Sequence, residues 1–191
     1  MLENLFTSGT RVKILGLLMF HPDEEYHLRG IARLIQTSPI YVSKELAKLE
    51  KINLVVSTRK ANLHLYSLNR DCVFLHDLRQ IFIKTDFLGE LVKKQLTGKV
   101  KYCFIYGSFA QGTEMRASDI DLFVVSDISE DELLSIVQQL EEKTGREVNY
   151  VLWNERTFFK RVKGHHLLRS IKKSKIIMLI GDEYEFKKRI Q

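Results

Sequence analysis

An apolar run that stops at a glycine, followed by two aspartates at the start of the next apolar run, restricts the fold of this 191-residue chain more than any other feature. The first run is Val100–Tyr106, which ends at Gly107-Ser108. The second run opens with Asp119 and Asp121, the first of them eleven residues after Ser108. Continuous apolar runs of this length are typical of buried strands. The sequence therefore predicts an α/β fold with a polar site where one strand ends and the next begins.

The spacing of the two aspartates favours a metal site. Residues separated by one position on a strand point to the same face, so Asp119 and Asp121 can share one cation. Mg²⁺ prefers carboxylate oxygens and completes its shell with water and phosphate. Gly107 has no side chain to obstruct a phosphate, Ser108 offers a hydroxyl and a backbone N–H, and Gly112 permits a tight return of the chain. In the alternative interpretation, Asp119 caps a strand and Asp121 pairs with a lysine.

The segments Ile105–Gly112 and Ser118–Leu122 together resemble the DNA polymerase β-type nucleotidyltransferases, specifically their minimal stand-alone members. The resemblance spans about residues 99–182. It implies a nucleotidyltransferase fold with a mixed sheet flanked by helices, Mg²⁺ or Mn²⁺ as the metal, and a nucleoside triphosphate, ATP being the expected one. The acceptor of the nucleoside monophosphate is a protein side chain, as the similarity to antitoxin-type transferases implies, or a small molecule.

The same resemblance implies roles for particular residues, and one of them departs from the family pattern. Asp119 and Asp121 would be catalytic metal ligands, and the nucleotide-binding residues are those of the glycine-rich turn: Gly107, Ser108 and Gly112. The family's third carboxylate falls on Asn149, which is neutral, and Glu147 lies two residues earlier on the same face as the candidate catalytic substitute. Two interpretations stay open, an active transferase or a domain that only senses a ligand or mediates assembly.

The remainder of residues 99–191 alternates between strands and helices. The predicted segments are a helix over Asp131–Glu142 with Ser129 as its cap, strands at Glu147–Trp153 and Ile176–Ile180, and a final helix from Asp182. An apolar stripe of Phe158, Phe159 and Val162 is expected in the core. The adjacent His165 and His166 are interpreted as surface or packing residues. Lys172, Lys173 and Lys175 are interpreted as a solvated edge, with a phosphate or nucleic-acid contact as the alternative.

Residues 8–69 have the order helix, short strand, helix, turn, helix and two strands. The third helix is expected to bury Val42, Leu46 and Leu49, and the strands are Leu54–Ser57 and Leu63–Leu68. This order, with the segments Leu28–Ala32, Thr37–Pro39 and Val42–Leu46, resembles winged helix-turn-helix regulators such as the ArsR-like and MarR-like families. The resemblance implies that the front of the chain reads double-stranded DNA and that the chain is a homodimer.

The candidate DNA-binding residues lie at the start and on the outward face of the third helix, and in the loop between the two strands. They are Thr37, Ser38, Tyr41, Lys44, Lys48, Arg59 and Lys60. The first turns of such a helix enter the major groove, and hydroxyls at its N-terminus contact phosphates. Glu45 is expected in the middle of the same outward face. The alternative is a winged helix that binds only protein.

Charge and composition set the remaining expectations. The 30 basic and 24 acidic residues give a net charge of +6, which favours a polyanionic partner. Residues 1–70 carry a net +4 and residues 99–191 a net +2, so the basic excess is expected mostly at the front. No signal peptide and no apolar stretch of about 20 residues is recognised, so a soluble cytoplasmic protein without membrane contact is expected.

The expected domain organisation has three parts. Residues 1–70 form the winged helix-turn-helix module, residues 71–98 a helical connector, and residues 99–191 the nucleotidyltransferase-like domain. The connector is interpreted as a packing spacer, with a dimer contact as the alternative.

Overall fold

The computed structural model of the chain describes residues 2–113, 118–162 and 164–190. The chain divides into two compact units, Met1–Phe82 and Ile83–Gln191, which we call the front and the rear unit. Both are mixtures of helices and strands, and each contains one sheet, so the predicted α/β class is confirmed. The division falls inside the predicted connector 71–98, whose role stays a prediction. Among the described residues, no helix is long and apolar enough to cross a membrane.

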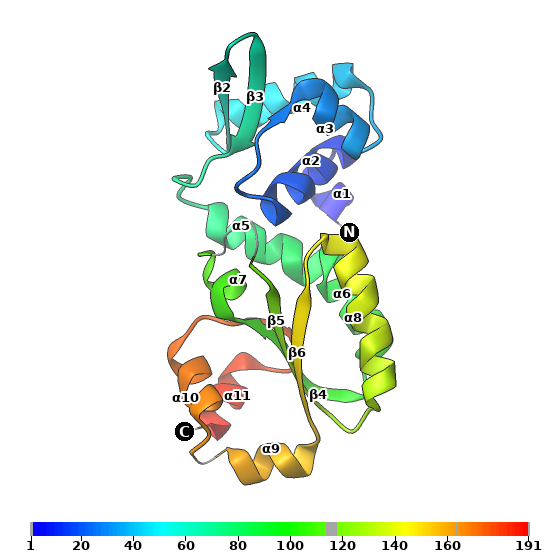
Figure 1. The fold of residues 1–191 in the computed structure, drawn as a ribbon, viewed down its shortest axis with the longest axis vertical. Helices are drawn as coiled ribbons and strands as arrows, with labels where there is room; N and C mark the ends of the chain where they lie inside the picture. The colour runs from blue at the N-terminus through cyan, green and yellow to red at the C-terminus, as the bar shows by residue number, and fades with distance from the viewer. Residues whose placement is uncertain (1, 114–117, 163, 191) are drawn as a thin grey trace. The chain divides into compact units, whose positions relative to one another are not determined.

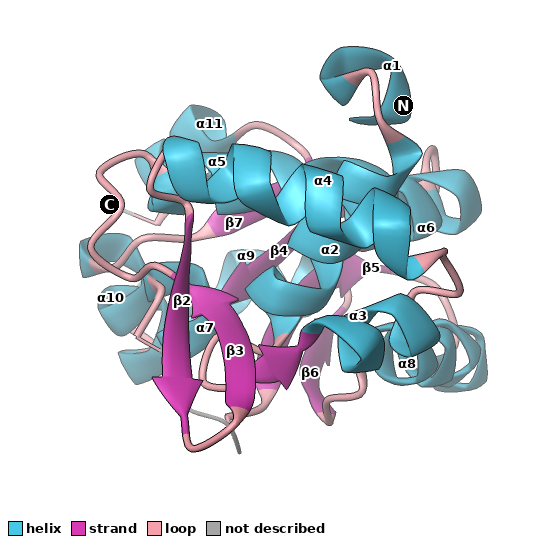
Figure 2. Ribbon diagram, turned by 90° about the horizontal axis from the view of Figure 1, so that it is seen from above, coloured by secondary structure: helices cyan, strands magenta, loops and turns pink. Residues whose placement is uncertain are grey.

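The front unit is built from helices around a small antiparallel sheet. Its elements are α1 (Leu2–Phe6), α2 (Gly9–Phe20), β1 (Tyr26–His27), α3 (Leu28–Leu34), α4 (Pro39–Lys51), β2 (Val55–Lys60), β3 (Leu63–Leu68) and α5 (Leu75–Phe82). The strand order is β1-β3-β2, and β2 and β3 form a hairpin (Figure 2). Val42, Leu46 and Leu49 of α4 are buried, as their helical spacing predicts. Helix α1 is not predicted from the sequence.

The rear unit contains a four-stranded mixed sheet. Its elements are the π-helical segment η1 (Ile83–Phe87), α6 (Gly89–Leu96), β4 (Val100–Tyr106), α7 (Gly107–Gln111), β5 (Ile120–Ser126), α8 (Glu130–Thr144), β6 (Val148–Trp153), α9 (Glu155–Arg161), α10 (His166–Lys173), β7 (Ile177–Ile180) and α11 (Glu183–Arg189). The strand order is β6-β5-β4-β7; β5 and β6 are parallel, and β4 is antiparallel to both β5 and β7. The caps follow the sequence prediction, since Ser129 Oγ accepts a hydrogen bond from the N–H of Glu132.

Helices cover both faces of this sheet (Figure 1). On one face, α9, α10 and α11 contribute Phe158, Leu168, Ile171 and Phe186 to a single apolar cluster. The sheet contributes aromatic and aliphatic residues from alternate positions of its strands: Tyr102, Phe104, Phe123, Val125 and Trp153. Side chains alternate along a strand, so Asp121 lies on the same sheet face as Phe123, and Asn149 on the same face as Trp153. The predicted site therefore lies at one end of the face that these three helices cover.

Candidate functional site

The two aspartates lie at the start of β5, in the interior of the rear sheet. Asp121 is opposite Tyr106, the last residue of β4, and opposite Asn149 near the start of β6. Asp119 precedes β5 by one residue, and both carboxylates are half-buried. The end of one strand and the start of two others thus meet here, as the apolar runs of the sequence predict.

Gly107 approaches Asp121 so closely that any other residue type would force a neighbouring atom to shift. A Cβ atom built on Gly107 would lie 2.1 Å from Asp121 Oδ2, and the Gly107 backbone has a φ of +73°. Left-handed backbone is unfavourable for residues with a Cβ atom. Helix α7 starts at this glycine and packs its Phe109 into the core. The short helix, the turn and the carboxylate therefore form one rigid corner.

The remaining residues of the turn hold the end of α7. The carbonyl oxygen of Ser108 accepts hydrogen bonds from the N–H groups of Gly112 and Thr113. Gly112 has a φ of 74° and caps α7 in the left-handed conformation. The structure places Ser108 directly beside Gly107, while Gly112 lies one helical turn away. Their nucleotide-binding roles stay predictions.

The electrostatics of the corner favour a cation. Burial raises the pKa of Asp121, and the negative charge of Asp119 raises it further. Burial and the nearby Asp121 also raise the pKa of the Tyr106 hydroxyl. Two neighbouring carboxylates disfavour each other's charged form, and a hard divalent cation would remove that repulsion. The donor set, oxygen atoms without thiol or imidazole, fits Mg²⁺ or Mn²⁺.

Asn149, near the start of β6, contacts the aspartate pair from the neighbouring strand. Its Nδ2 donates a hydrogen bond of 3.0 Å to Asp119 Oδ2. Glu147 is exposed and precedes β6, and the described residues contain no group of three or more His, Cys, Asp or Glu placed to hold a metal. The structure therefore brings Asn149, but not Glu147, together with the aspartates. The catalytic role of Glu147 stays a prediction.

Arg146 is a positioning residue that the sequence does not reveal. It is buried, its Nη1 donates a hydrogen bond of 2.6 Å to the carbonyl oxygen of Ser118, and its guanidinium lies 5.9 Å from the ring centroid of Phe109. Arg146 thus fastens the residue before Asp119 to helix α7. Only its place two residues before an apolar strand sets this arginine apart in the sequence, and that signal is weak.

In the front unit, the candidate DNA-binding residues of the third helix share one surface. Ser38 is the N-cap of α4, and Tyr41, Lys44 and Lys48 follow it at helical spacing and are exposed. Thr37, just before the helix, is half-buried, and its hydroxyl donates to the carbonyl oxygen of Ile35.

The prediction for Glu45 is wrong. Its side chain is only 9% exposed; it lies 2.8 Å from Arg11 Nε and 2.7 Å from Lys48 Nζ. Burial opposes ionisation of Glu45, but the hydrogen bonds and positive charges of Lys48 and Arg11 outweigh it and lower its pKa. Arg11 of α2 thus draws Glu45 inward, because a partly buried guanidinium needs a carboxylate partner, and Lys48 of α4 adds a second cation. Glu45 is therefore withdrawn from the outward face of α4, and its ion pair neutralises part of the charge of Lys48.

The predicted loop between the two strands is shorter than expected. Arg59 and Lys60 belong to β2, paired with His64 and Leu63, and only Ala61 and Asn62 form the turn. Arg59 is exposed. Lys60 Nζ donates a hydrogen bond of 2.6 Å to Glu25 Oε2, so part of its charge is neutralised within the front unit.

Comparisons with known proteins agree with the geometry of the rear unit. Residues 88–177 match the family model described as polymerase beta, nucleotidyltransferase. A protein of Methanocaldococcus jannaschii, named "Putative protein adenylyltransferase MJ0604", is 30% identical over 77 residues, which cover 40% of this chain and 76% of that protein.

Two solved structures show weaker likeness. A crystal structure of a toxin-antitoxin with AMP-PNP is 19% identical and has a TM-score of 0.39; the match covers 54% of this chain and 81% of that one. A mutant of ZitR from Lactococcus lactis is 26% identical and has a TM-score of 0.37; the match covers 48% of this chain and 60% of that one. Both TM-scores are below 0.5, so neither likeness establishes a fold.

Proposed function

Because the chain belongs to the polymerase beta nucleotidyltransferase family, we propose that its rear unit binds a nucleoside triphosphate with a divalent cation and transfers a nucleoside monophosphate to an acceptor. The observation that carries the proposal is the corner of Gly107, Asp119 and Asp121, where two carboxylates meet a residue without a side chain. Asp119 and Asp121 would hold the cation. Ser108 would offer its hydroxyl and its N–H to phosphate oxygens.

The proposed reaction exchanges one bond at the α-phosphorus. An oxygen of the acceptor hydroxyl forms a bond to this phosphorus, the bond to the bridging oxygen of the β-phosphate breaks, and pyrophosphate leaves. The hydroxyl proton is released to solvent. Bound Mg²⁺ or Mn²⁺ would neutralise the negative charge of the triphosphate. The chain's own contribution is to hold these groups in a fixed geometry, which Arg146 supports through Ser118.

We propose ATP as the nucleotide and a protein side chain as the acceptor. The support is the name of the relative from Methanocaldococcus jannaschii, a protein adenylyltransferase that shares the rear region. A second candidate function follows from Asn149. Because this amide replaces a carboxylate, a domain that binds the nucleotide as a signal without transferring it is the alternative.

Calorimetric titration with a non-hydrolysable ATP analogue tests nucleotide binding without knowledge of the acceptor. We expect Mg²⁺-dependent binding to the full chain, weakened at least about 100-fold in Asp119→Ala/Asp121→Ala because the cation loses both protein ligands. Binding should also weaken as the pH falls, and at a higher pH than for an ordinary aspartate, because the pKa of Asp121 is raised.

The matched control for this titration removes two carboxylates elsewhere in the rear unit. Asp127 and Asp131 are both exposed, so Asp127→Ala/Asp131→Ala should bind the analogue as the unmodified chain does. Two results would contradict the proposed site: binding of the analogue that is equally strong without Mg²⁺, or unchanged binding in Asp119→Ala/Asp121→Ala.

For the front unit we propose sequence-specific binding of double-stranded DNA by a homodimer, and hence a role in transcription regulation. The supporting observations are the exposed Tyr41 and Lys44 on α4, the buried Glu45 behind them, and Arg59 on the hairpin. Domains that place a helix in the major groove commonly bind as dimers to two half-sites.

Salt dependence tests this second proposal. We expect Lys44→Ala and Arg59→Ala each to weaken duplex binding and to reduce the slope of log affinity against log salt by about 1, because each loses a phosphate contact. The affinity can be followed by anisotropy of a labelled duplex. Lys93→Ala/Lys94→Ala removes charge from helix α6 of the rear unit and should leave the slope unchanged. If the affinity of the unmodified chain for the duplex did not change with salt concentration, the proposal would be wrong.

A further inference from the structure

The basic charge of the rear unit is concentrated in its last three helices. Residues 155–191 contain eleven Lys and Arg but only four Asp and Glu, whereas residues 99–154 contain five and ten. The net charge of the chain, +6, conceals this separation. The sequence expectation that the basic excess lies mostly at the front does not capture it, because the opposite charges of the two halves of residues 99–191 nearly cancel.

The structure turns these charges toward solvent. Helices α9, α10 and α11 bury Phe158, Leu168, Ile171 and Phe186 in one cluster on the sheet, so their other faces form the outer layer of the rear unit. The exposed basic residues of this layer include Arg156, Lys160, Arg169, Lys172, Lys173 and Lys188. We call this surface the basic layer.

Carboxylates neutralise little of the basic layer. Within the described residues, the ion pairs at these helices are Lys101 with Glu155, at 2.5 Å, and Lys187 with Glu183, at 2.8 Å. No ion pair between Lys160, Lys172 or Lys188 and a carboxylate occurs in the described part of the chain. Unneutralised lysines and arginines in such number repel one another and attract a polyanion.

Exposed aromatic side chains accompany the charges. Phe159 is 47% exposed and Tyr184 is 72% exposed, so the prediction that Phe159 lies in the core is wrong. The Lys101 ammonium lies 4.9 Å from the Phe159 ring centroid and the Arg189 guanidinium 6.0 Å from it, which places α9 and α11 on one continuous surface. Flat rings among cations match the pattern of single-stranded nucleic-acid binding, in which bases stack on aromatics and phosphates meet basic residues.

We propose that the basic layer binds single-stranded nucleic acid without sequence preference. Its lysines and arginines contact the phosphodiester backbone, and Tyr184 and Phe159 stack on unpaired bases. A duplex keeps its bases stacked inside the helix, and an acidic peptide backbone does not repeat a charge and a flat ring at every unit, so single-stranded nucleic acid fits both features best. The inference is independent of the proposed transfer reaction, because it requires neither Asp119 nor Asp121.

Fluorescence anisotropy of labelled oligouridylate and oligothymidylate with the full chain tests the proposal. We expect Lys172→Glu/Lys173→Glu to weaken binding at least about 10-fold and to reduce the salt slope by about 1.4, since each lost phosphate contact removes about 0.7. Tyr184→Ala should weaken binding about 5-fold or more without changing the salt slope, because stacking releases no counterions. Oligouridylate and oligothymidylate should bind alike if the backbone is recognised, whereas preference for the first would assign the 2′-hydroxyl a role.

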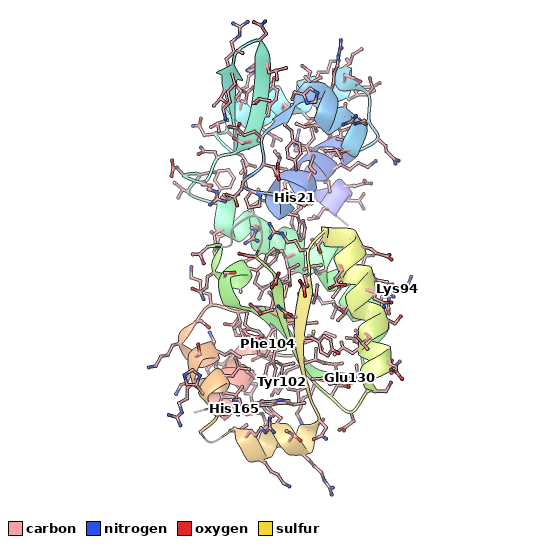
Figure 3. All side chains as sticks on the ribbon, viewed as in Figure 1. His21, Lys94, Tyr102, Phe104, Glu130 and His165 are labelled. Atoms are coloured by element: carbon pink, nitrogen blue, oxygen red, sulfur yellow. The ribbon has the colours of Figure 1, made fainter. Side chains whose placement is uncertain are left out.

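The matched control reverses the charge of two lysines that belong to the same unit but lie outside the basic layer. Lys94 lies beside α8, away from His165 at the start of α10 (Figure 3), so Lys93→Glu/Lys94→Glu should bind as the unmodified chain does. Asp119→Ala/Asp121→Ala should also retain binding, which separates this test from that of the transferase site. Duplex binding that Lys172→Glu/Lys173→Glu weakens as much as it weakens oligonucleotide binding would overturn the inference, because the front unit, the proposed duplex-binding part, does not contain these lysines. Binding of polyglutamate as tightly as the oligonucleotides would overturn it as well. Circular dichroism confirms that each variant is folded.

Discussion

Replacing Gly107 with alanine should abolish Mg²⁺-dependent nucleotide binding and lower the free energy of unfolding by about 2–4 kcal/mol. Two costs add at this position. Left-handed backbone is unfavourable for alanine, and the new methyl group would lie 2.1 Å from Asp121 Oδ2. Asp121 pairs with Tyr106, the last residue of β4 before this glycine, so the new methyl group lies on the same side of the sheet end as the carboxylate. Either the Asp121 side chain or helix α7 must move, and each movement removes the proposed site.

A second glycine separates the backbone cost from the steric cost. Gly98 has a φ of +83°, and a Cβ atom built there meets no atom within 4 Å. Gly98→Ala should therefore lose about 1 kcal/mol of stability and bind nucleotide normally. Chemical denaturation and the calorimetric titration measure both effects. If Gly107→Ala and Gly98→Ala behaved alike in both measurements, the close approach of Gly107 to Asp121 would contribute neither to stability nor to nucleotide binding.

The strands and their polar ends follow from the sequence because their signals are local. Val100–Tyr106 is a strand over the same residues that its apolar run indicates, and Asp119 and Asp121 lie at the start of the next. Buried strands are continuous apolar runs, and two neighbouring strands bring their ends together wherever the chain returns. The meeting of these strand ends, with Asp121 at the corner, is therefore predictable from the amino-acid sequence alone.

Residues whose environment depends on distant partners could not be placed in this way. Glu45 belongs by spacing to the polar side of α4, yet Arg11, 34 positions away, draws it into a buried ion pair. Phe159 belongs by spacing to an apolar stripe, but the short helix α9 has room to bury only Phe158. Arg146 bonds to Ser118, 28 positions away. In each case, the burial of the side chain depends on packing against another segment of the chain. The spacing of residues within one helix or strand carries no information about that packing.

Replacing Asn149 with aspartate should have opposite effects without and with Mg²⁺. Without the cation, the change removes the hydrogen bond from Asn149 Nδ2 to Asp119 Oδ2 and adds a third negative charge beside Asp121. We expect a loss of about 1–2 kcal/mol in the free energy of unfolding, and a further rise in the pKa of Asp121. With Mg²⁺ present, the third carboxylate becomes a ligand, and we expect about 10-fold tighter cation binding and faster transfer.

Thermal unfolding at increasing Mg²⁺ concentration distinguishes these effects, because a ligand that binds only the folded state stabilises it in proportion to the logarithm of its concentration. The stability curves of Asn149→Asp and the unmodified chain should therefore cross as Mg²⁺ rises. Asn149→Ala, which loses the same hydrogen bond without adding charge, should stay below the unmodified chain at every concentration. Parallel behaviour of the aspartate and alanine variants would mean that the side chain of residue 149 does not contact the cation. A crossing with transfer only in Asn149→Asp would identify the natural domain as a nucleotide sensor, whereas transfer in both would show that two carboxylates suffice for the reaction.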